Sequence, residues 1–488
     1  MRRLLTLALG AVGLATLLGA ALSANGTVSG GFRVPAALLA FGAGSVGALL
    51  ARRGPGGPRP VGRLATLVVL GLALVVRVAV APSVRPVAER AEAGAPGDDA
   101  EYLLLAEGLL DRGEFADGED DYLGLPLSPP QRAWRAPGFA FALAGHFALF
   151  GRGSGALLNL GLGVLLCGIA MALAGCLGGP RAGLAAGLAA ALCPSLVLWS
   201  NLLFAETLLA VLVAGGLALW LFSERRTAAA LAGGLLLGSA VLTRPSVLFV
   251  PLALAVVEAA RSADFRRSLA RLGFLAVGFS AAVLPWAIRN HHVLDRWLLA
   301  TSTGGNLLGA VSSPDGGFCL AAWRDLHADI PPDRYPDYEV RRNDEGLRRA
   351  WALLAGDPSR LLRQVPRRFA SLFGRDDQCA YWAFERGAPG ANVSARGARG
   401  VLNAAWLALL WLACGAALAR AARREGGRLL MPGAVAAAVT AVHLVFESQD
   451  RYHVVLTPVL IVAAAVLLFG DRPSLAADPR GPAEGMAR

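Results

Sequence analysis

The residues of this sequence best suited to chemistry are three carboxylates within four positions, Asp98, Asp99 and Glu101, followed at once by Tyr102. Carboxylates in such a group can take a proton from a hydroxyl or bind a cation. An ordinary helix start explains part of the pattern, because Asp caps helix N-termini and the helix dipole favours acids in the first turn. That explanation accounts for one acid better than for three, so both interpretations stay open.

A basic residue stands inside an apolar stretch. Arg244 lies midway through residues 228–259, between Thr243 and Pro245. An Arg at the centre of a membrane helix costs about 2.5–3.5 kcal/mol. A break at Pro245 relieves that cost, because the stretch then becomes two helices that meet at the water interface. Snorkelling of Arg244 to lipid headgroups is the alternative explanation.

Two further charged positions border apolar runs. Glu206 lies near the start of one run, where an ionisable group indicates a functional site unless it forms a structural salt bridge. Arg451 belongs to the polar segment 447–452 between the last two runs, which a solvated hairpin would also explain. Carboxylates and arginines at one membrane face suit a substrate whose phosphate lies at the interface. A carboxylate takes the proton of an attacking hydroxyl, and Arg stabilises the departing phosphate.

The composition indicates an integral membrane protein. The 488 residues are 55% hydrophobic, and the mean hydropathy is +0.53, which excludes a soluble enzyme. The formal net charge is +11, and every fixed positive charge is Arg, since the sequence contains no Lys. In a membrane protein such a charge reports arginines on the cytoplasmic side, and it does not indicate nucleic-acid binding.

We therefore predict an all-α polytopic membrane protein with about 12 transmembrane helices, a re-entrant or interfacial helix and two long outer loops. The twelve apolar runs are 4–22, 34–51, 64–81, 155–177, 182–199, 202–222, 228–243, 246–259, 272–288, 401–418, 430–446 and 452–469. Arginine clusters between them place both termini in the cytoplasm and the segments 82–135 and 290–400 outside. This parity requires that 137–150 does not cross, and its short length with His146 in the middle fits an interfacial helix.

Short motifs of this chain resemble, in the same order, those of the family 39 membrane glycosyltransferases with the GT-C fold, relatives of the protein O-mannosyltransferases and the lipid A aminoarabinose transferase. They are Asp98-Asp99-Ala100-Glu101-Tyr102, Arg135-Ala136-Pro137-Gly138-Phe139, Ala205-Glu206-Thr207, Thr243-Arg244-Pro245, Leu284-Pro285-Trp286, and Arg451-Tyr452 with Pro458. Each motif is short, and their shared order over roughly 96–458 carries the resemblance. Ala136 and Phe139 depart from the family pattern, which has Pro and Tyr there, and the first two predicted helices precede the family core.

The resemblance implies an inverting enzyme that moves a sugar from a polyprenyl-phosphate-linked donor to a hydroxyl of a lipid, glycan or protein. The expected place is the outer face of a bacterial cytoplasmic membrane. The resemblance implies Asp98 or Asp99 as catalytic base, and it implies substrate or donor-phosphate binding by Arg244, Arg451, Glu206, Arg135 and Tyr102. Some relatives bind a divalent metal at the acidic loop, but carboxylates this close could equally share a proton, so a metal stays open.

Two other function classes compete with this interpretation. A secondary transporter also has many spans and intramembrane charges, but transporters place those charges near the midplane and often contain internal repeats. The two halves of this sequence show no convincing repeat, and its charges gather at one surface. An accessory membrane subunit without activity would tolerate replacement of Asp98, Asp99 and Arg244.

The predicted domain organisation follows from the runs and loops. It comprises two N-terminal transmembrane helices (1–60), a GT-C-like membrane core (61–289) with the acidic loop 82–136, an outer loop or small subdomain (290–400), C-terminal transmembrane helices (401–470) and a disordered cytoplasmic tail (471–488). The first run could instead be a signal peptide. Amphipathic helices are expected at 98–110 and 358–373, and Gly304-Gly305 could form a turn near a ligand. Cys319 and Cys379 could pair in an oxidising compartment or stay free.

Overall fold

The structure of the protein is a computed structural model that describes residues 61–94, 97–116, 130–224, 228–262, 264–314, 316–388, 393–421 and 429–470. Within these ranges all regular secondary structure is helical. The first two predicted membrane helices, the possible signal peptide and the C-terminal tail lie outside the described residues.

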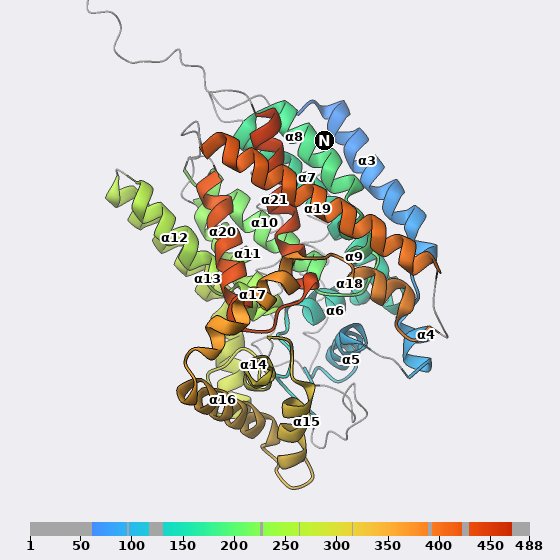
Figure 1. Ribbon diagram of the computed structural model, residues 1–488, viewed down its shortest axis with the longest axis vertical. Helices are drawn as coiled ribbons and strands as arrows, with labels where there is room; N and C mark the ends of the chain where they lie inside the picture. The colour runs from blue at the N-terminus through green and yellow to red at the C-terminus, as the bar shows by residue number, and fades with distance from the viewer. Residues whose placement is uncertain are drawn as a thin grey trace, which may run out of the picture.

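The predicted membrane runs of the described part form a bundle of packed helices (Figure 1). They are α3 (Arg63–Val80), α7 (Gly155–Gly178), α8 (Pro180–Leu192), α9 (Pro194–Trp199), α10 (Glu206–Phe222), α11 (Ala228–Thr243), α12 (Val250–Arg261), α13 (Phe265–Leu294), α19 (Val393–Ala421), α20 (Leu430–Val445) and α21 (Thr457–Phe469). Four helical stretches are long and apolar enough to cross a membrane, namely Arg63–Glu92, Arg152–Gly178, Phe265–Leu294 and Ala395–Leu418. The protein is thus a multi-pass membrane protein. Among the described residues, four helical stretches meet these requirements of length and apolar composition.

Several runs are interrupted where the sequence predicts continuous helices. The run 182–199 breaks between α8 and α9, because Pro194 has no N–H to donate to the preceding turn. Buried Arg77 of α3 meets the freed carbonyls, and its Nη1 donates to the oxygen of Ala191 at 3.3 Å. The last run likewise begins as a 3-10 turn, η7 (Asp450–Val455), before α21.

Specific contacts define two ends of the bundle. At one end the ion pair of Glu206 with Arg244 joins the start of α10 to the residue after α11. At the opposite end the ion pair of Glu258 with Arg271 joins α12 to α13. The described residues of 81–154 and of 295–388 lie on the side of the first pair (Figure 1), which we call the loop end.

The short helix α6 (Gly138–Phe150) has both ends at the loop end. A Cβ on Gly138 would stand 2.8 Å from the backbone N of Thr243, the last residue of α11. A Cβ on Gly155, where α7 begins, would stand 3.2 Å from both Phe147 of α6 and Leu203, which precedes α10. These contacts hold both ends of α6 at the loop end, and the prediction of a re-entrant or interfacial helix at 137–150 stays a prediction.

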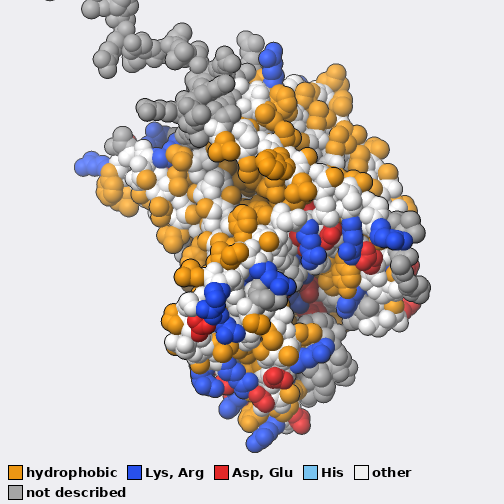
Figure 2. Space-filling model, in the orientation of Figure 1, with side chains coloured by type: hydrophobic (Ala, Val, Ile, Leu, Met, Phe, Trp, Pro, Cys, Tyr) orange, Lys and Arg blue, Asp and Glu red, His pale blue; other side chains and the backbone are white. Residues whose placement is uncertain are grey.

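The second long loop folds into helices with a small hydrophobic cluster of their own (Figure 1). They are α14 (Ser302–Ser312), α15 (Leu320–Asp329), α16 (Tyr338–Gly356), α17 (Arg360–Phe373), α18 (Gln378–Ala380) and a π-helical turn, η5 (Tyr381–Glu385). We call residues 295–388 the loop subdomain. Its bounds are narrower than predicted, because α13 continues to Leu294 and α19 already begins at Val393. Figure 2 shows hydrophobic side chains over the bundle, whereas Arg, Asp and Glu gather over the loop subdomain.

Three local predictions have clear outcomes. Helices form at both expected places, as α5 (Asp98–Asp111) and α17. Only α17 is amphipathic, since α5 buries Asp99 and Glu101 together with its apolar residues, and Gly97, not Asp98, is the N-cap of α5. Gly304 forms no turn, since it lies inside α14, where a Cβ would stand 1.9 Å from the carbonyl oxygen of Asn343 in α16. Cys319 and Cys379 are free thiols.

The tightest helix crossing of the bundle provides a test of the packing. A Cβ on Gly278 of α13 would stand 2.1 Å from the carbonyl oxygen of Leu231 in α11. We therefore expect Gly278→Ala to destabilise the protein by about 1–3 kcal/mol. Gly273→Ala on the same helix is the control, because nothing lies within 4 Å of its added Cβ. Thermal unfolding in detergent measures both, and equal shifts of Tm for the two variants would contradict this crossing.

Candidate active site

The three carboxylates of the acidic loop have separate partners. Asp98 is bound by two arginines: its Oδ1 lies 3.1 Å from Nη2 of Arg135, and its Oδ2 lies 2.9 Å from Nη1 of Arg451. Asp99 is 0% exposed and forms an ion pair with Arg90 of α4 (Val87–Glu92). Glu101 pairs with Arg135. Only the first of the three carboxylates is thus bound to the last predicted motif.

Helix geometry explains this division. Residues three apart lie on the same face of a helix, whereas adjacent residues point about 100° apart. Asp98 and Glu101 therefore share one guanidinium, and Asp99 points toward α4. The turn that starts α5 needs Gly97, because a Cβ there would stand 2.5 Å from the ring of Trp382 in η5.

The second motif leads from the acidic loop into α6. Arg135 lies just before this helix, and Phe139 in its first turn packs edge to face on Tyr102, with 5.0 Å between the ring centres. Tyr102 is buried at this contact. The structure thus places Arg135 beside Asp98 and Glu101, while Tyr102 packs between α5 and α6, and their roles in substrate binding stay predictions.

The next two motifs meet at the loop end of the bundle. Nη2 of Arg244 donates to Oε1 of Glu206 at 2.6 Å. Pro245 ends α11, as predicted, so that Arg244 follows the last turn of the helix and is not in its middle. Glu206 thus forms a salt bridge, and this contact is compatible both with a structural role and with a functional site.

The last motif joins these groups. Nη2 of Arg451 donates to the hydroxyl of Tyr452 at 3.1 Å, and that hydroxyl donates to Oε2 of Glu447 at 2.8 Å. The guanidinium carbon of Arg244 lies 5.3 Å from the centre of the Tyr452 ring, within reach of a cation–π contact. The polar segment 447–452 is therefore part of a connected network and not a solvated hairpin.

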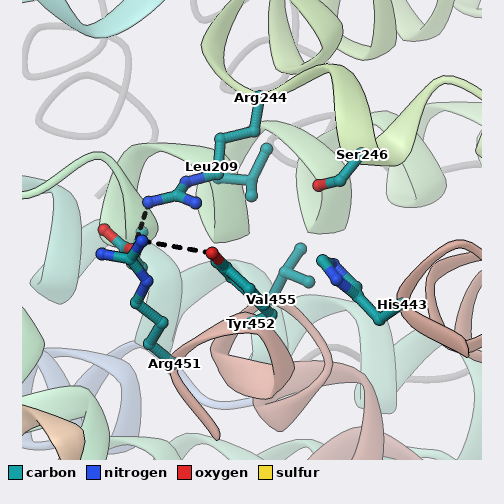
Figure 3. A pocket seen from close by; sticks show the side chains of 8 residues that line it. Leu209, Arg244, Ser246, His443, Arg451, Tyr452 and Val455 are labelled. Carbon is teal, nitrogen blue, oxygen red and sulfur yellow. Dashed lines mark hydrogen bonds and ion pairs between the residues drawn. The ribbon is translucent and has the colours of Figure 1, made fainter. Parts of the chain in front are cut away.

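A small cavity opens between these elements (Figure 3). Its walls are formed by Glu206, Leu209, Arg244, Ser246, His443, Arg451, Tyr452 and Val455. The Nε atoms of Arg244 and Arg451 are buried without a hydrogen-bond partner in the described part of the chain, and so is Oε2 of Glu206. Unpaired buried polar atoms are costly, so the two arginines are poised to donate to an anion.

The arginines control the ionisation of Asp98. Burial alone would raise the pKa of this carboxyl, but the positive charges of Arg135, Arg451 and Arg244 outweigh that effect and hold its pKa well below its usual value. Asp98 is consequently ionised at neutral pH.

The described carboxylates of the acidic loop do not form a divalent-metal site. Among the residues that the structure describes, no three His, Cys, Asp or Glu side chains gather in a way that could hold a metal ion. Asp98 and Glu101 are both bound by Arg135, whose fixed positive charge takes the place beside their oxygens that a cation would need.

The sequence did not indicate the carboxylate that binds the backbone segment just before α6. Glu339 of α16 accepts hydrogen bonds from the backbone N–H groups of Arg132 at 2.8 Å and Ala133 at 2.7 Å. The Thr301 hydroxyl donates a third at 2.7 Å. Glu339 is 6% exposed, and this burial raises its pKa, although the three donors oppose the shift. The loop subdomain thereby fixes the segment that carries Arg135.

A second such carboxylate adjoins the last motif. Asp450 is fully buried, and its Oδ2 accepts from the backbone N–H groups of Asp377 at 2.7 Å and Gln378 at 2.9 Å. It thereby joins η7 to α18 of the loop subdomain. The residue directly before Arg451 thus anchors the turn from which that guanidinium extends.

No protein-family model matches this sequence, and the search of curated proteins finds no match either. Comparison with solved structures finds remote likenesses. ArnT from Cupriavidus metallidurans bound to undecaprenyl phosphate is 16% identical, with a TM-score of 0.42, over 80% of this chain and 77% of that chain. The same protein in the apo state is 17% identical, with a TM-score of 0.36, over 82% and 77%.

The third likeness is to the archaeal oligosaccharyltransferase AglB from Archaeoglobus fulgidus, in complex with an inhibitory peptide and a dolichol-phosphate. It is 14% identical, with a TM-score of 0.46, and covers 82% of this chain and 50% of that chain. At identities of 14–17% and TM-scores of 0.36–0.46, these likenesses are remote and assign no role to a residue of this chain.

The anchoring role of Glu339 can be tested without an activity assay. Glu339→Gln replaces one acceptor oxygen by an NH2 group that faces N–H donors. An unsatisfied buried group costs about 1–3 kcal/mol, so we expect the amides of Arg132 and Ala133 to exchange with deuterium about tenfold faster or more. Glu345→Gln, on the surface of the same helix, is the control. Unchanged exchange in Glu339→Gln would disprove the anchor.

Proposed function

We propose that this protein is an inverting glycosyltransferase, which moves a sugar from a polyprenyl-phosphate-linked donor to a hydroxyl of a lipid, glycan or protein. The loop end of the bundle would face the exterior of a bacterial cytoplasmic membrane. One observation carries the proposal: Arg244 and Arg451 line a cavity with unpartnered Nε atoms, and Arg451 also binds the carboxylate of Asp98. Transfer from a sugar phosphate requires hydrogen-bond donors for the phosphate anion and an ionised carboxylate next to them.

The donor phosphate would bind to Arg244 and Arg451. Arg244 already forms an ion pair with Glu206, and Arg451 forms one with Asp98. The charge of each guanidinium group is therefore balanced before the donor binds. The free Nε atoms supply additional donors for phosphate oxygens, and charge-assisted hydrogen bonds of this kind are about twice as strong as neutral ones. The lipid phosphates named with two of the similar structures belong to the same ligand class.

Asp98 is the carboxylate that we assign as the general base. Asp99 is enclosed with Arg90, and Glu101 lies against Arg135, whereas Asp98 reaches Arg451 at the cavity wall. Its low pKa makes it a weak base in the free protein. A bound phosphate places a negative charge beside Arg451, which weakens the hold on Asp98 and increases its basicity. Binding of the donor would in this way prepare the base.

The reaction step balances with these residues alone. The acceptor hydroxyl oxygen attacks the anomeric carbon, and its proton passes to Asp98. The bond from that carbon to the phosphate oxygen breaks, and the electron pair stays on the phosphate, where Arg244 and Arg451 stabilise it. The donor is a phosphodiester, so the leaving group is an ionised polyprenyl phosphate, which needs no proton from an acid. A single displacement inverts the anomeric configuration.

The cellular test follows the donor. A strain that lacks this protein is expected to accumulate one polyprenyl-phosphate sugar, which mass spectrometry of extracted lipids detects. Wild-type protein is expected to relieve the accumulation. An unchanged lipid pool in all strains would contradict the proposal and favour the secondary transporter.

Two adjacent isosteric substitutions separate catalysis from folding. Asp98→Asn removes the base, and we expect it to lower activity by about 10²-fold or more. The amide oxygen of Asn can still accept a hydrogen bond from a guanidinium group, and Arg135 keeps its ion pair with Glu101, so this variant should lose less stability than Asp99→Asn. Asp99→Asn leaves the buried charge of Arg90 unpaired, which costs about 3–5 kcal/mol, so we expect poor folding. Complementation of the lipid phenotype, with protein yield and Tm, distinguishes the two. Normal activity of folded Asp98→Asn would contradict its role.

The pH dependence tests how Asp98 is controlled. Because its pKa lies well below the usual value, wild-type kcat/KM should show no loss from Asp98 protonation until the pH falls below about 4. Arg135→Gln removes one of the charges that lower this pKa, so the acid limb should move to higher pH. Arg152→Gln, which affects only the surface ion pair with Asp111, is the control. An identical limb in wild type and Arg135→Gln would refute this account.

A further inference from the structure

The cavity has a second wall that the phosphate does not use. Ser246 of η4 (Pro245–Val247) and His443 of α20 lie opposite the side where the guanidinium group of Arg451 points (Figure 3). The ring of Tyr452 stands between the two walls in this view. Both side chains are uncharged when the imidazole is neutral, in contrast to the arginines and the carboxylate of the first wall.

The hydrogen bonds of His443 determine what it offers. Its Nδ1 lies 2.9 Å from the carbonyl oxygen of Glu447. A carbonyl only accepts, so Nδ1 carries the hydrogen, and Nε2 of the neutral ring is an acceptor. Nε2 has no hydrogen-bond partner among the described residues.

Stacking fixes the direction of this acceptor. The imidazole of His443 lies parallel to the ring of Tyr452, with 4.6 Å between centres and 13° between planes. The side chain is only 4% exposed, and its open side is the cavity. The Tyr452 hydroxyl is already engaged with Arg451 and Glu447 and cannot serve as the partner of Nε2. Nε2 is therefore a preorganised acceptor without a donor among the residues that the structure describes.

Ser246 adds a complementary group. Its hydroxyl points into the same space in Figure 3, and it can donate or accept. A fixed acceptor beside a hydroxyl matches a ligand that carries hydroxyl groups, whereas phosphate oxygens only accept and would find no donor in Nε2. The two walls thus differ in the chemistry that they recognise.

We infer that His443 and Ser246 form a subsite for a hydroxyl of the donor's sugar, and that this subsite discriminates the sugar-bearing lipid from the bare polyprenyl phosphate. This inference rests on the proposed function, because it takes the phosphate to lie on Arg244 and Arg451. The sugar then projects from the phosphate toward α20. After transfer the sugar contacts are lost, so the bare lipid phosphate is held less tightly and can leave.

Competitive lipid binding tests this subsite. The purified protein is incubated with undecaprenyl phosphate and with the polyprenyl-phosphate sugars extracted from the strain that lacks it, and native mass spectrometry counts which lipid is bound. Wild type should enrich one sugar-bearing lipid. His443→Phe keeps a ring to stack on Tyr452 but loses Nε2, and the ratio of sugar-bearing to bare lipid should fall about tenfold. Binding of undecaprenyl phosphate alone should be unchanged.

Matched variants separate the possible results. Ala441→Leu, on the exposed side of α20, should keep the wild-type ratio, while Arg451→Gln should weaken binding of both lipids. An unchanged ratio in folded His443→Phe would overturn the subsite and leave the proposed function standing. Equal loss of both lipids in His443→Phe would also overturn it, because that result assigns His443 to the phosphate. Failure of the wild type to bind either lipid would instead refute the proposed function, and the subsite with it.

Discussion

The ion pair of Asp98 with Arg451 joins residues 353 positions apart, and the rest of the loop end depends on it. Asp98 opens α5, which follows the first described membrane helix, and Arg451 precedes the last one. Both charges are largely withdrawn from water, and a buried charge is tolerated only when it is paired. The acidic loop, the segment before α6 and the η7 turn must therefore close together, and the cavity lies where they meet the helix ends.

Such closure requires irregular backbone next to a membrane, where every free N–H and C=O group needs a partner. The chain supplies these partners as side chains from distant segments. Arg368 of α17 donates to the carbonyl oxygens of Leu444 at 2.8 Å and Val445 at 2.6 Å, which end α20. Glu339 and Asp450, in contrast, accept hydrogen bonds from backbone N–H groups. The loop subdomain thus holds three sides of the site through groups that do not enter the cavity.

Periodicity and charge position predicted much of this arrangement. The apolar runs located the helices, and a single expected face brought Asp98, Glu206, Arg244 and Arg451 together. The different environments of Asp98 and Asp99 could not be predicted, because they arise from the packing of α4 and η5 against one turn of helix. Glu339 could not be predicted for another reason: it is one of many charged residues in α16, and its partners are backbone groups about 200 residues earlier, at Arg132 and Ala133.

Three charged residues in or beside the cavity, Asp98, Glu206 and Arg244, stand at the helix ends that favour their charge. Asp98 and Glu206 begin α5 and α10, where the positive end of the helix dipole stabilises a carboxylate. Arg244 follows the last turn of α11, where the negative end stabilises a cation. The helix ends thus favour these three charges before any ligand binds. A substrate phosphate then needs only to redistribute existing ion pairs, because neither a proton transfer nor a helix rearrangement must precede its binding.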